Sequence, residues 1–248
     1  MPLIKSVSMT VDGSKVAKEL PDVRTVVVKG KLKEHFLYTI ESLLAMDTSG
    51  YYGAIDGKSS YRDLDGEHYL LFRDGSSGIR SMDKVCQTTG VVPSTHVIRY
   101  TGDDIKFRSF YMEQGLSSYS SVYTDMRKYS HAITDAQWCR LIMLVDNLLG
   151  FEFVVFEDGA LRFNPQDGMP LSAEAQKFVY MIMAECYLTP PNYKRVLLLS
   201  DIPYLDNQMQ IKLFKRLGEL PGFGITLTTA DIGFTDIQER DSISFLNL

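Results

Sequence analysis

The sequence has few cysteines, and their arrangement does not indicate a metal site. Only three occur in 248 residues, Cys86, Cys139 and Cys186. They are widely spaced and odd in number, and no CxxC pair or Cys/His cluster is present. This pattern argues against a zinc site and predicts reduced thiols packed inside a cytosolic protein. We therefore expect no bound metal.

Long apolar runs are also missing. No stretch reaches the roughly 18 apolar residues that a membrane-spanning helix requires. The first residues contain neither a long apolar run nor a cleavage-like site, so no secretion signal is expected. We therefore expect a cytoplasmic protein with no membrane partner.

Several catalytic and cofactor-binding motifs are absent as well. No GxSxG sequence occurs, which argues against a serine hydrolase with a nucleophile on a sharp turn. No GxGxxG sequence occurs, so the dinucleotide-binding fingerprint is missing. The four histidines, His35, His68, His96 and His131, are scattered without a partnering motif. We expect them to be packing or surface residues.

The composition is that of a globular chain. Hydrophobic residues make up 45% of the sequence and charged residues 23%, which argues against a disordered protein. The net charge of −5 gives no overall attraction for nucleic acid, although a local basic patch remains open. No repeat or linker divides the chain. We expect a single domain over residues 1–248, with a β-rich subdomain or insertion at 47–125.

The first part of the chain predicts strands followed by a helix. Leu3–Thr10 alternates apolar and polar residues, and Val16–Leu20 can form a second short strand. Arg24–Lys29 contains three consecutive valines, which is typical of a buried strand. After Gly30, apolar residues at helical spacing predict a helix: Phe36, Leu37, Ile40, Leu43 and Leu44.

The next part, Met46–Gly102, is rich in Gly, Ser, Asp and Tyr. Strand-like runs occur at Tyr51–Ile55, His68–Arg73 and His96–Tyr100, and Asp-Gly turn signals lie between them. This pattern predicts an antiparallel β region. Beyond it, we expect Gly115–Tyr123 to form a surface loop, with a ligand or partner loop as the alternative.

The rest of the chain alternates helix and strand signals. Thr134-Asp135 can cap a helix over Ala136–Leu149, and Phe153–Phe163 reads as a hairpin. A helix start at Ser172, an apolar strand at Val196–Leu199, a helix at Ile211–Leu220 and a strand at Gly224–Thr229 follow. This alternation predicts an α/β fold, in which functional residues lie at strand ends.

The turn at Gly30–Phe36 stands where a phosphate-binding loop would stand in such a fold. A loop of that kind needs several glycines, a lysine for the phosphates and a Ser or Thr for magnesium. Only the first glycine is present, and no Gly-Lys-Ser/Thr sequence follows. Lys31 and Lys33 could contact an anion, whereas Glu34 would repel it. We prefer an ordinary strand-to-helix turn, with weak phosphate binding as the alternative.

The order of these segments resembles the ATP-binding cassette (ABC) ATPases, in their RecF/SMC/OLD-like branch. Leu171–Lys177 (LSAEAQK) resembles the signature motif, and Val196–Ile202 (VLLLSDI) resembles the Walker B strand. Leu205-Asp206 resembles the D-loop, and Ile225–Asp231 (ITLTTAD) resembles the switch strand. The resemblance implies an α/β P-loop NTPase (ABC-ATPase-like) core with an antiparallel β-rich N-terminal and middle region.

The residues that carry the chemistry of that family are altered here. Glu174 stands in place of the signature glycine, and Ser200 in place of the Walker B aspartate that holds magnesium. Asp201 stands in place of the catalytic glutamate, and Ala230 in place of the switch histidine. Several residues of one phosphoryl-transfer site are therefore altered together. The resemblance implies a degenerate pseudo-ATPase in which the fold is kept without hydrolysis.

The resemblance to ABC ATPases further implies a protein-interaction or regulatory subunit without a cofactor. Its expected setting is a DNA repair, recombination or defence complex. ABC ATPases dimerise through the signature motif and the D-loop. The expected partner is therefore an intact ABC-type ATPase or a second copy of this chain. The contact would be lined by Ser172, Glu174, Gln176 and Asp206.

Two alternatives remain open. The chain could be a divergent but active ATPase of DNA repair or defence that uses ATP and magnesium, with Asp201 as the base. The degenerate nucleotide-binding set would then be Gly30, Lys31, Lys33, Ser200 and Asp201, with Lys31 or Lys33 on phosphate. Alternatively, the region 96–129 could bind nucleic acid, because aromatic and basic residues interleave at Tyr123–Tyr129 (YTDMRKY).

Overall fold

The computed structural model describes residues 3–46, 51–52, 66–73, 78–82, 85–88, 95–100, 135–157, 160–168, 171–188, 194–200, 205–221, 224–237 and 242–248. Its contacts divide the chain into two compact units. Unit 1 consists of Met1–Tyr100, Pro191–Asp201 and Gly222–Leu248, and unit 2 consists of Thr101–Pro190 and Ile202–Pro221. A single domain with a subdomain at 47–125 stays a prediction. Residues 101–134, including the loop at Gly115–Tyr123 and the Tyr123–Tyr129 patch, lie outside the described part.

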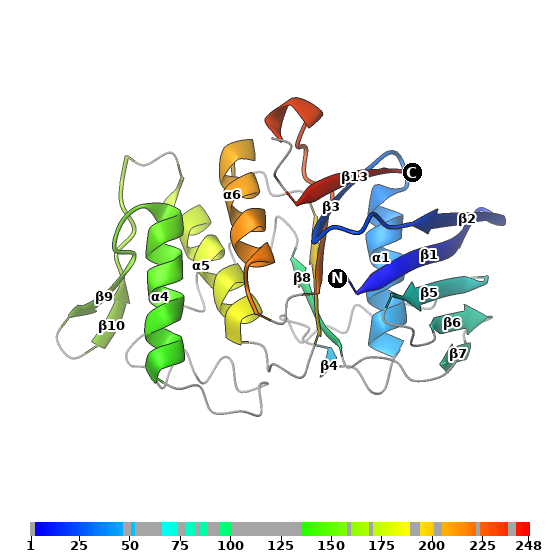
Figure 1. Cartoon of the computed structure of the whole chain (residues 1–248), viewed down its shortest axis with the longest axis horizontal. Coiled ribbons are helices and arrows are strands. Elements are labelled where there is room, and N and C mark those ends of the chain that lie inside the picture. Colours follow the sequence, from blue (N-terminus) through cyan, green and yellow to red (C-terminus); the bar gives the residue numbers. More distant parts are fainter. Residues whose placement is uncertain are drawn as a thin grey trace. The chain divides into compact units, whose positions relative to one another are not determined.

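Unit 1 contains a six-stranded sheet in which every described pair of strands is parallel (Figure 1). In spatial order its strands are β13 (Ile243–Asn247), β3 (Thr25–Lys29), β12 (Ile225–Thr228), β11 (Lys194–Leu199), β8 (Thr95–Tyr100) and β4 (Tyr51–Tyr52). Strands covered on both faces read as continuous apolar runs. The predicted runs in β3 and β11 follow this rule, because residues 26–28 and 196–199 have no exposed surface. The α/β class predicted from the sequence is confirmed.

A second sheet in unit 1 is antiparallel. Its strands lie in the order β2 (Ser14–Glu19), β1 (Ile4–Val11), β5 (His68–Phe72), β6 (Ile79–Met82) and β7 (Val85–Thr88). The strands at the beginning of the chain pair with those of the middle region, with Val7 opposite Leu70. The predicted antiparallel N-terminal and middle region is therefore present over these strands.

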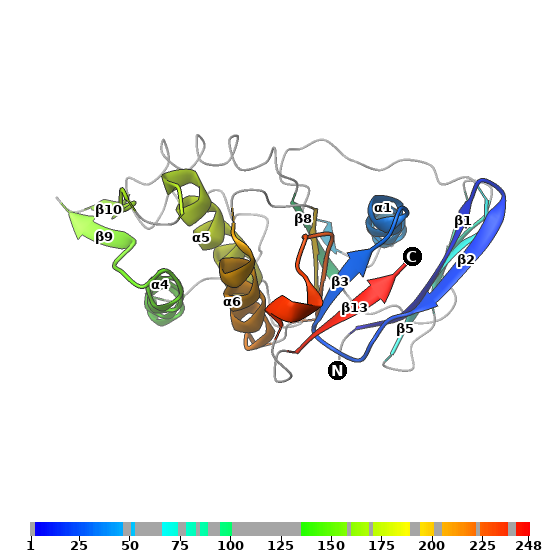
Figure 2. The same ribbon diagram turned by 90° about the horizontal axis from the view of Figure 1, so that it is seen from above.

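Helix α1 (Lys33–Met46) lies between the two sheets of unit 1 (Figure 2). Its apolar residues fall at the predicted helical spacing, and Phe36, Leu37 and Ile40 are fully buried or nearly so. Apolar residues of both sheets join it in one core: Ile4, Val7 and Met9 of β1, Leu70 and Phe72 of β5, Val196 and Leu198 of β11, and Ile225 and Leu227 of β12. The core thus fixes the start of α1 beside the ends of β11 and β12.

Two strands of the middle region were assigned to the wrong sheet by the sequence pattern. We expected His96–Tyr100 and the strand at Tyr51 to belong to the antiparallel region. In the structure β8 runs parallel to β11, with His96 opposite Arg195, and β4 runs parallel to β8. Alternation and turn signals are local, and they do not encode which distant strand becomes the neighbour.

Over its described residues, unit 2 contains three helices and one hairpin. The helices are α4 (Asp135–Leu149), α5 (Ala173–Leu188) and α6 (Asn207–Gly218), and each contacts the other two. The hairpin pairs β9 (Val154–Glu157) with β10 (Ala160–Phe163) in antiparallel register, as the sequence predicts. Phe153, Phe163 and Tyr180 pack against one another, with the Phe153 and Phe163 ring centroids 4.9 Å apart. Burial raises the pKa of the Tyr180 hydroxyl.

Candidate functional site

The carboxyl ends of β3, β12 and β11 lie side by side at one edge of the parallel sheet. Thr228 is in register with both Val27 and Leu199, and the ladder continues one residue further because Thr229 N donates to Leu199 O at 3.0 Å. Side chains alternate between the two faces of a sheet. Leu198 packs in the core with α1, and Ser200, two positions on, reaches α1 through its hydrogen bond to Glu34.

Gly30 begins the turn that joins β3 to α1 at this edge. Its φ of +102° is a conformation that side chains with a Cβ rarely adopt. A Cβ at this position would also lie 2.1 Å from the backbone oxygen of Leu248. The end of the chain is held there because Leu248 N donates to Lys29 O at 3.0 Å. The glycine that sequence analysis assigned to a degenerate phosphate loop is therefore required by the backbone itself. Lys31, in the same turn, is exposed to solvent.

Ser200 and Glu34 meet across this edge. Ser200 Oγ donates a hydrogen bond to Glu34 Oε2 at 3.1 Å, although the two residues lie 166 positions apart in the sequence. Ser200 is 8% exposed, whereas Glu34, in the first turn of α1, is exposed. The Ser200 hydroxyl, which stands where the resemblance requires a magnesium ligand, is therefore engaged with a carboxylate of the same chain.

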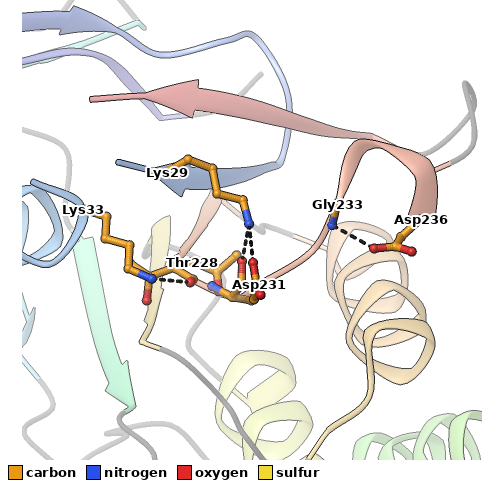
Figure 3. Close-up of polar contacts among 8 residues, drawn as sticks. Lys29, Lys33, Thr228, Asp231, Gly233 and Asp236 are labelled. Carbon is orange, nitrogen blue, oxygen red and sulfur yellow. Dashed lines mark hydrogen bonds and ion pairs between the residues drawn. The ribbon is translucent and has the colours of Figure 1, made fainter. Parts of the chain in front are cut away.

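Lys29 and Lys33, on either side of the turn, contact the segment after β12 (Figure 3). Lys33 Nζ donates to Thr229 O at 3.3 Å. Lys29 Nζ donates to Ala230 O at 3.1 Å and lies 3.3 Å from Asp231 Oδ1. Lys29 was not among the predicted site residues, although its position at the end of a buried strand is a signal that the sequence carries. The exposed Asp231 carboxylate is screened by solvent, so the bond to Ala230 O is the more constraining contact.

The segment that resembles the switch strand makes its own internal contacts. Ala230 N donates to Thr228 Oγ1 at 3.1 Å, and the Ala230 side chain is fully buried. An alanine side chain has no hydrogen-bonding atom. Thr229 Oγ1 is buried and has no hydrogen-bond partner among the residues that the structure describes. Downstream, Gly233 N donates to Asp236 Oδ2 at 2.8 Å and closes a short turn (Figure 3).

Asp201, the candidate catalytic residue, lies outside the described residues. Over the described ranges, no group of three or more His, Cys, Asp or Glu residues could hold a metal ion. The described residues at this edge do not fit magnesium-bound ATP. The Ser200 hydroxyl is bonded to Glu34, the ammonium groups of Lys29 and Lys33 are bonded to carbonyls, and the Glu34 carboxylate has the same charge as phosphate.

The residues that resemble the signature motif begin helix α5 in unit 2. Ser172 Oγ accepts from Ala175 N at 3.2 Å, so the exposed Ser172 caps the helix. Gln176 is fully buried, and its side-chain amide donates to Gln166 O and Leu171 O, both at 3.0 Å, and accepts from Gln166 N at 3.0 Å. Gln176 thus holds the preceding loop against the helix start. The Glu174 side chain lies outside the described part of the chain.

The residues that resemble the D-loop repeat this arrangement at the start of α6. Asp206 Oδ1 accepts from Met209 N at 2.7 Å and caps the helix. Gln210 Nε2 donates to Leu205 O at 2.7 Å, as Gln176 does to Leu171 O. Both helix starts therefore read Leu-cap-x-x-x-Gln, with the leucine buried and the glutamine turned back onto its carbonyl. This repeat was not predicted, although the spacing of its residues is visible in the sequence.

Comparison with known proteins gives a fold and no closer relationship. No protein-family model and no curated protein matches the chain. A solved SMC head, described as "Crystal structure of the SmcHead bound to the C-winged helix domain of ScpA", superposes with a TM-score of 0.50 at 14% sequence identity. The match covers 98% of this chain and 96% of that one. The SMC head domain from Thermotoga maritima gives a TM-score of 0.47 at 14% identity, over 92% and 89% of the two chains.

The chain is therefore similar in fold to this SMC head, and it combines helices with a parallel sheet and antiparallel sheets. The predicted ABC-ATPase-like fold is confirmed at this level. At 14% identity the match carries the fold alone, and the role of each candidate residue stays a prediction. Over the described residues, no helix is both long and apolar enough to cross a membrane.

Proposed function

We propose that this chain is a non-hydrolysing protein with an ABC-ATPase-like fold that acts as a protein-interaction or regulatory subunit. The observation that carries the proposal is the hydrogen bond between Ser200 Oγ and Glu34 Oε2. It places a carboxylate of the chain beside the hydroxyl that replaces the metal-binding aspartate. Phosphoryl transfer depends on metal and cationic groups that neutralise phosphate charge, and a carboxylate opposes that requirement.

Two further contacts support the proposal. Lys29 and Lys33 are held on backbone carbonyls of residues 229 and 230, so neither ammonium is free for a phosphate in this conformation. Ala230 has no polar side-chain atom with which to contact a γ-phosphate or an attacking water. Altering one of these groups would be compatible with a variant mechanism. Their joint alteration favours a fold without catalysis.

Protein partnering is supported by the fold. The SMC head of similar structure is described as bound to the C-winged helix domain of ScpA, so a fold of this kind can present a docking surface. We propose a protein partner for this chain as well, either an intact ABC-type ATPase or a second copy. Exposed Ser172 and Asp206 would contribute to the contact, while the buried Gln176 would shape it from behind. A cytoplasmic DNA repair, recombination or defence complex is the proposed setting.

A steady-state hydrolysis assay with ATP and magnesium tests the absence of catalysis. We expect no phosphate release above the protein-free rate from the wild type or from Asp201→Asn. Turnover by the wild type that Asp201→Asn abolishes would establish the alternative of a divergent ATPase.

Sedimentation velocity tests the self-association arm. If the chain pairs with itself, we expect Asp206→Arg to shift the protein toward monomer, while Asp206→Asn, which keeps the helix cap, leaves the equilibrium unchanged. A monomeric wild type would remove the homodimer and leave a different protein as the partner.

A further inference from the structure

The turn before β13 exposes an aromatic ring. Phe234 is 71% exposed, and among the described residues one other large apolar side chain, Met143 at 63%, is exposed to a similar degree. Phe234 begins the short 3-10 helix η1 (Phe234–Asp236). Its ring lies on that of Phe245 in β13, with the centroids 3.9 Å apart and 35° between the planes. One side of the Phe234 ring is therefore supported by the sheet, and the rest of the ring faces solvent.

Backbone contacts of the turn fix the position of this ring. Gly233 N donates to Asp236 Oδ2 at 2.8 Å (Figure 3), and Ile237 N donates to Phe234 O at 3.4 Å. Strand β13 is itself anchored, because it pairs with β3 and because Leu246 packs in the core with α1. A group that is held in place before contact loses less conformational freedom when a partner binds.

The segment that carries Phe234 is acidic. Residues 231–241 contain four carboxylates and one arginine, a net charge of −3: Asp231, Asp236, Glu239 and Asp241 against Arg240. The Asp231 side chain is fully exposed, and although Lys29 lies 3.3 Å from it, the local balance stays negative. An exposed aromatic ring in a negatively charged segment favours a cation, because the ring face and the carboxylates attract the same sign of charge.

A second copy of this chain does not meet that requirement in a symmetric contact. In a two-fold dimer through this surface, the turn would face the same turn of the partner, and like charges would oppose each other. The whole chain also carries a net charge of −5. The charge of the surface therefore favours a different protein with a basic segment.

We propose that Phe234 is the docking point for an arginine side chain of a basic partner protein. The guanidinium plane stacks on the open face of the Phe234 ring, and its N–H groups pair with the carboxylate of Asp231 or Asp236. Arginine suits this arrangement better than lysine, because its planar group combines stacking on an aromatic ring with directed hydrogen bonds to a carboxylate. The inference deepens the proposed function, on which it rests, because it gives the protein partner a surface in unit 1 and a charge.

Titration of a short arginine peptide, acetyl-Gly-Arg-Gly-Arg-Gly-amide, into the full chain, followed by NMR, tests the inference. The matched control peptide has citrulline, a neutral isostere, at both arginine positions. We expect the arginine peptide to bind about fivefold more tightly than the citrulline peptide, because only the cation is attracted to the ring face and the carboxylates. Phe234→Ala is expected to remove this difference. Met143→Ala, which removes the other exposed large apolar side chain, is expected to keep it.

Equal affinity of the two peptides for the wild type overturns the inference, as does a difference that Phe234→Ala leaves intact. Should Phe234→Ala not fold, Phe234→Leu decides by the same criterion, because leucine keeps an apolar side chain without the ring. Sedimentation velocity covers the second copy as occupant. Self-association of the wild type that Phe234→Ala abolishes would assign this surface to a contact between copies and contradict the basic partner.

The two proposals fail separately. Hydrolysis of ATP by the wild type would contradict the proposed function whatever the peptide titration shows. Equal affinity for the two peptides, with no hydrolysis by the wild type, contradicts only the arginine contact at Phe234.

Discussion

The sheet edge of unit 1 and the helix starts of unit 2 both contain residues that resemble nucleotide-binding motifs, and they use those residues differently. At the sheet edge, Ser200 bonds to Glu34 and Lys33 to Thr229, across 166 and 196 positions of sequence. At the helix starts, Ser172, Gln176 and Asp206 bond to residues no more than 10 positions away. The first region joins distant segments, whereas the second shapes the local backbone. Changes at the two regions should therefore have different consequences.

The largest difference is expected between two glycines with positive φ, one in each unit. Gly30→Ala combines a φ of +102° with a Cβ 2.1 Å from Leu248 O, and we expect the free energy of unfolding to fall by about 3 kcal/mol or more. Gly150→Ala has a φ of +88° but nothing within 4 Å, so a loss of about 1 kcal/mol is expected. Urea unfolding followed by circular dichroism measures both. Equal losses would show that the contact with Leu248 is relieved by a shift of the chain.

The second largest difference in stability is expected between alanine variants of Gln176 and Gln210, the two glutamines at the helix starts. Gln176→Ala removes three hydrogen bonds and leaves Gln166 and Leu171 groups unpaired, for an expected loss of about 2–4 kcal/mol. Gln210→Ala removes one bond to Leu205 O, and Gln210 Oε1 has no partner among the described residues, so about 1–2 kcal/mol is expected. Urea unfolding midpoints, compared at constant m-value, show which variant loses more stability. A larger loss in Gln210→Ala would contradict the stabilising role of the three Gln176 hydrogen bonds.

A smaller effect is expected at the cap of α6. Asp206→Ala should lower the free energy of unfolding by about 1 kcal/mol, because Met209 N loses its acceptor. Asp206→Asn and Asp206→Ser, which keep a capping oxygen, are the controls and should stay close to the wild type. A loss as large in Asp206→Asn as in Asp206→Ala would mean that the charge, and not the cap, matters at this position.

The smallest effect is a pH dependence in unit 2. Burial raises the pKa of the Asp146 carboxyl, although hydrogen bonds from Phe153 N and Val154 N partly offset the shift. The folded protein therefore favours the protonated carboxyl, so the free energy of unfolding falls as pH rises from below the ordinary carboxyl pKa of 3.8 through the raised pKa of the folded state. Asp146→Asn should remove this fall, and the gap between variant and wild type should change with pH across that window. A gap independent of pH would contradict the assignment.

Much of the fold could be predicted from the sequence, because its signals are local. The valines of β3, the apolar run of β11 and the spacing of Phe36, Leu37 and Ile40 in α1 each reflect burial of one element. The direction of β8 could not be predicted, since its partner β11 lies about a hundred positions away and the pairing leaves no local mark.

The candidate site shows the same limit. Ser200 follows the predicted apolar strand and Lys33 begins the predicted helix, but the bond from Ser200 to Glu34 depends on how β11 meets α1. Gln176 was predicted at a contact surface, whereas its side chain is fully buried. The sequence pattern marks the start of α5 but does not show which of its polar residues turns inward.

Binding of ATP with magnesium, measured by isothermal titration on the wild-type chain, tests the central claim most directly. The account predicts no binding up to millimolar ATP, because Ser200 and Lys33 are engaged within the chain and Glu34 stands beside them. Micromolar binding that requires magnesium and is lost in Asp201→Asn would contradict it.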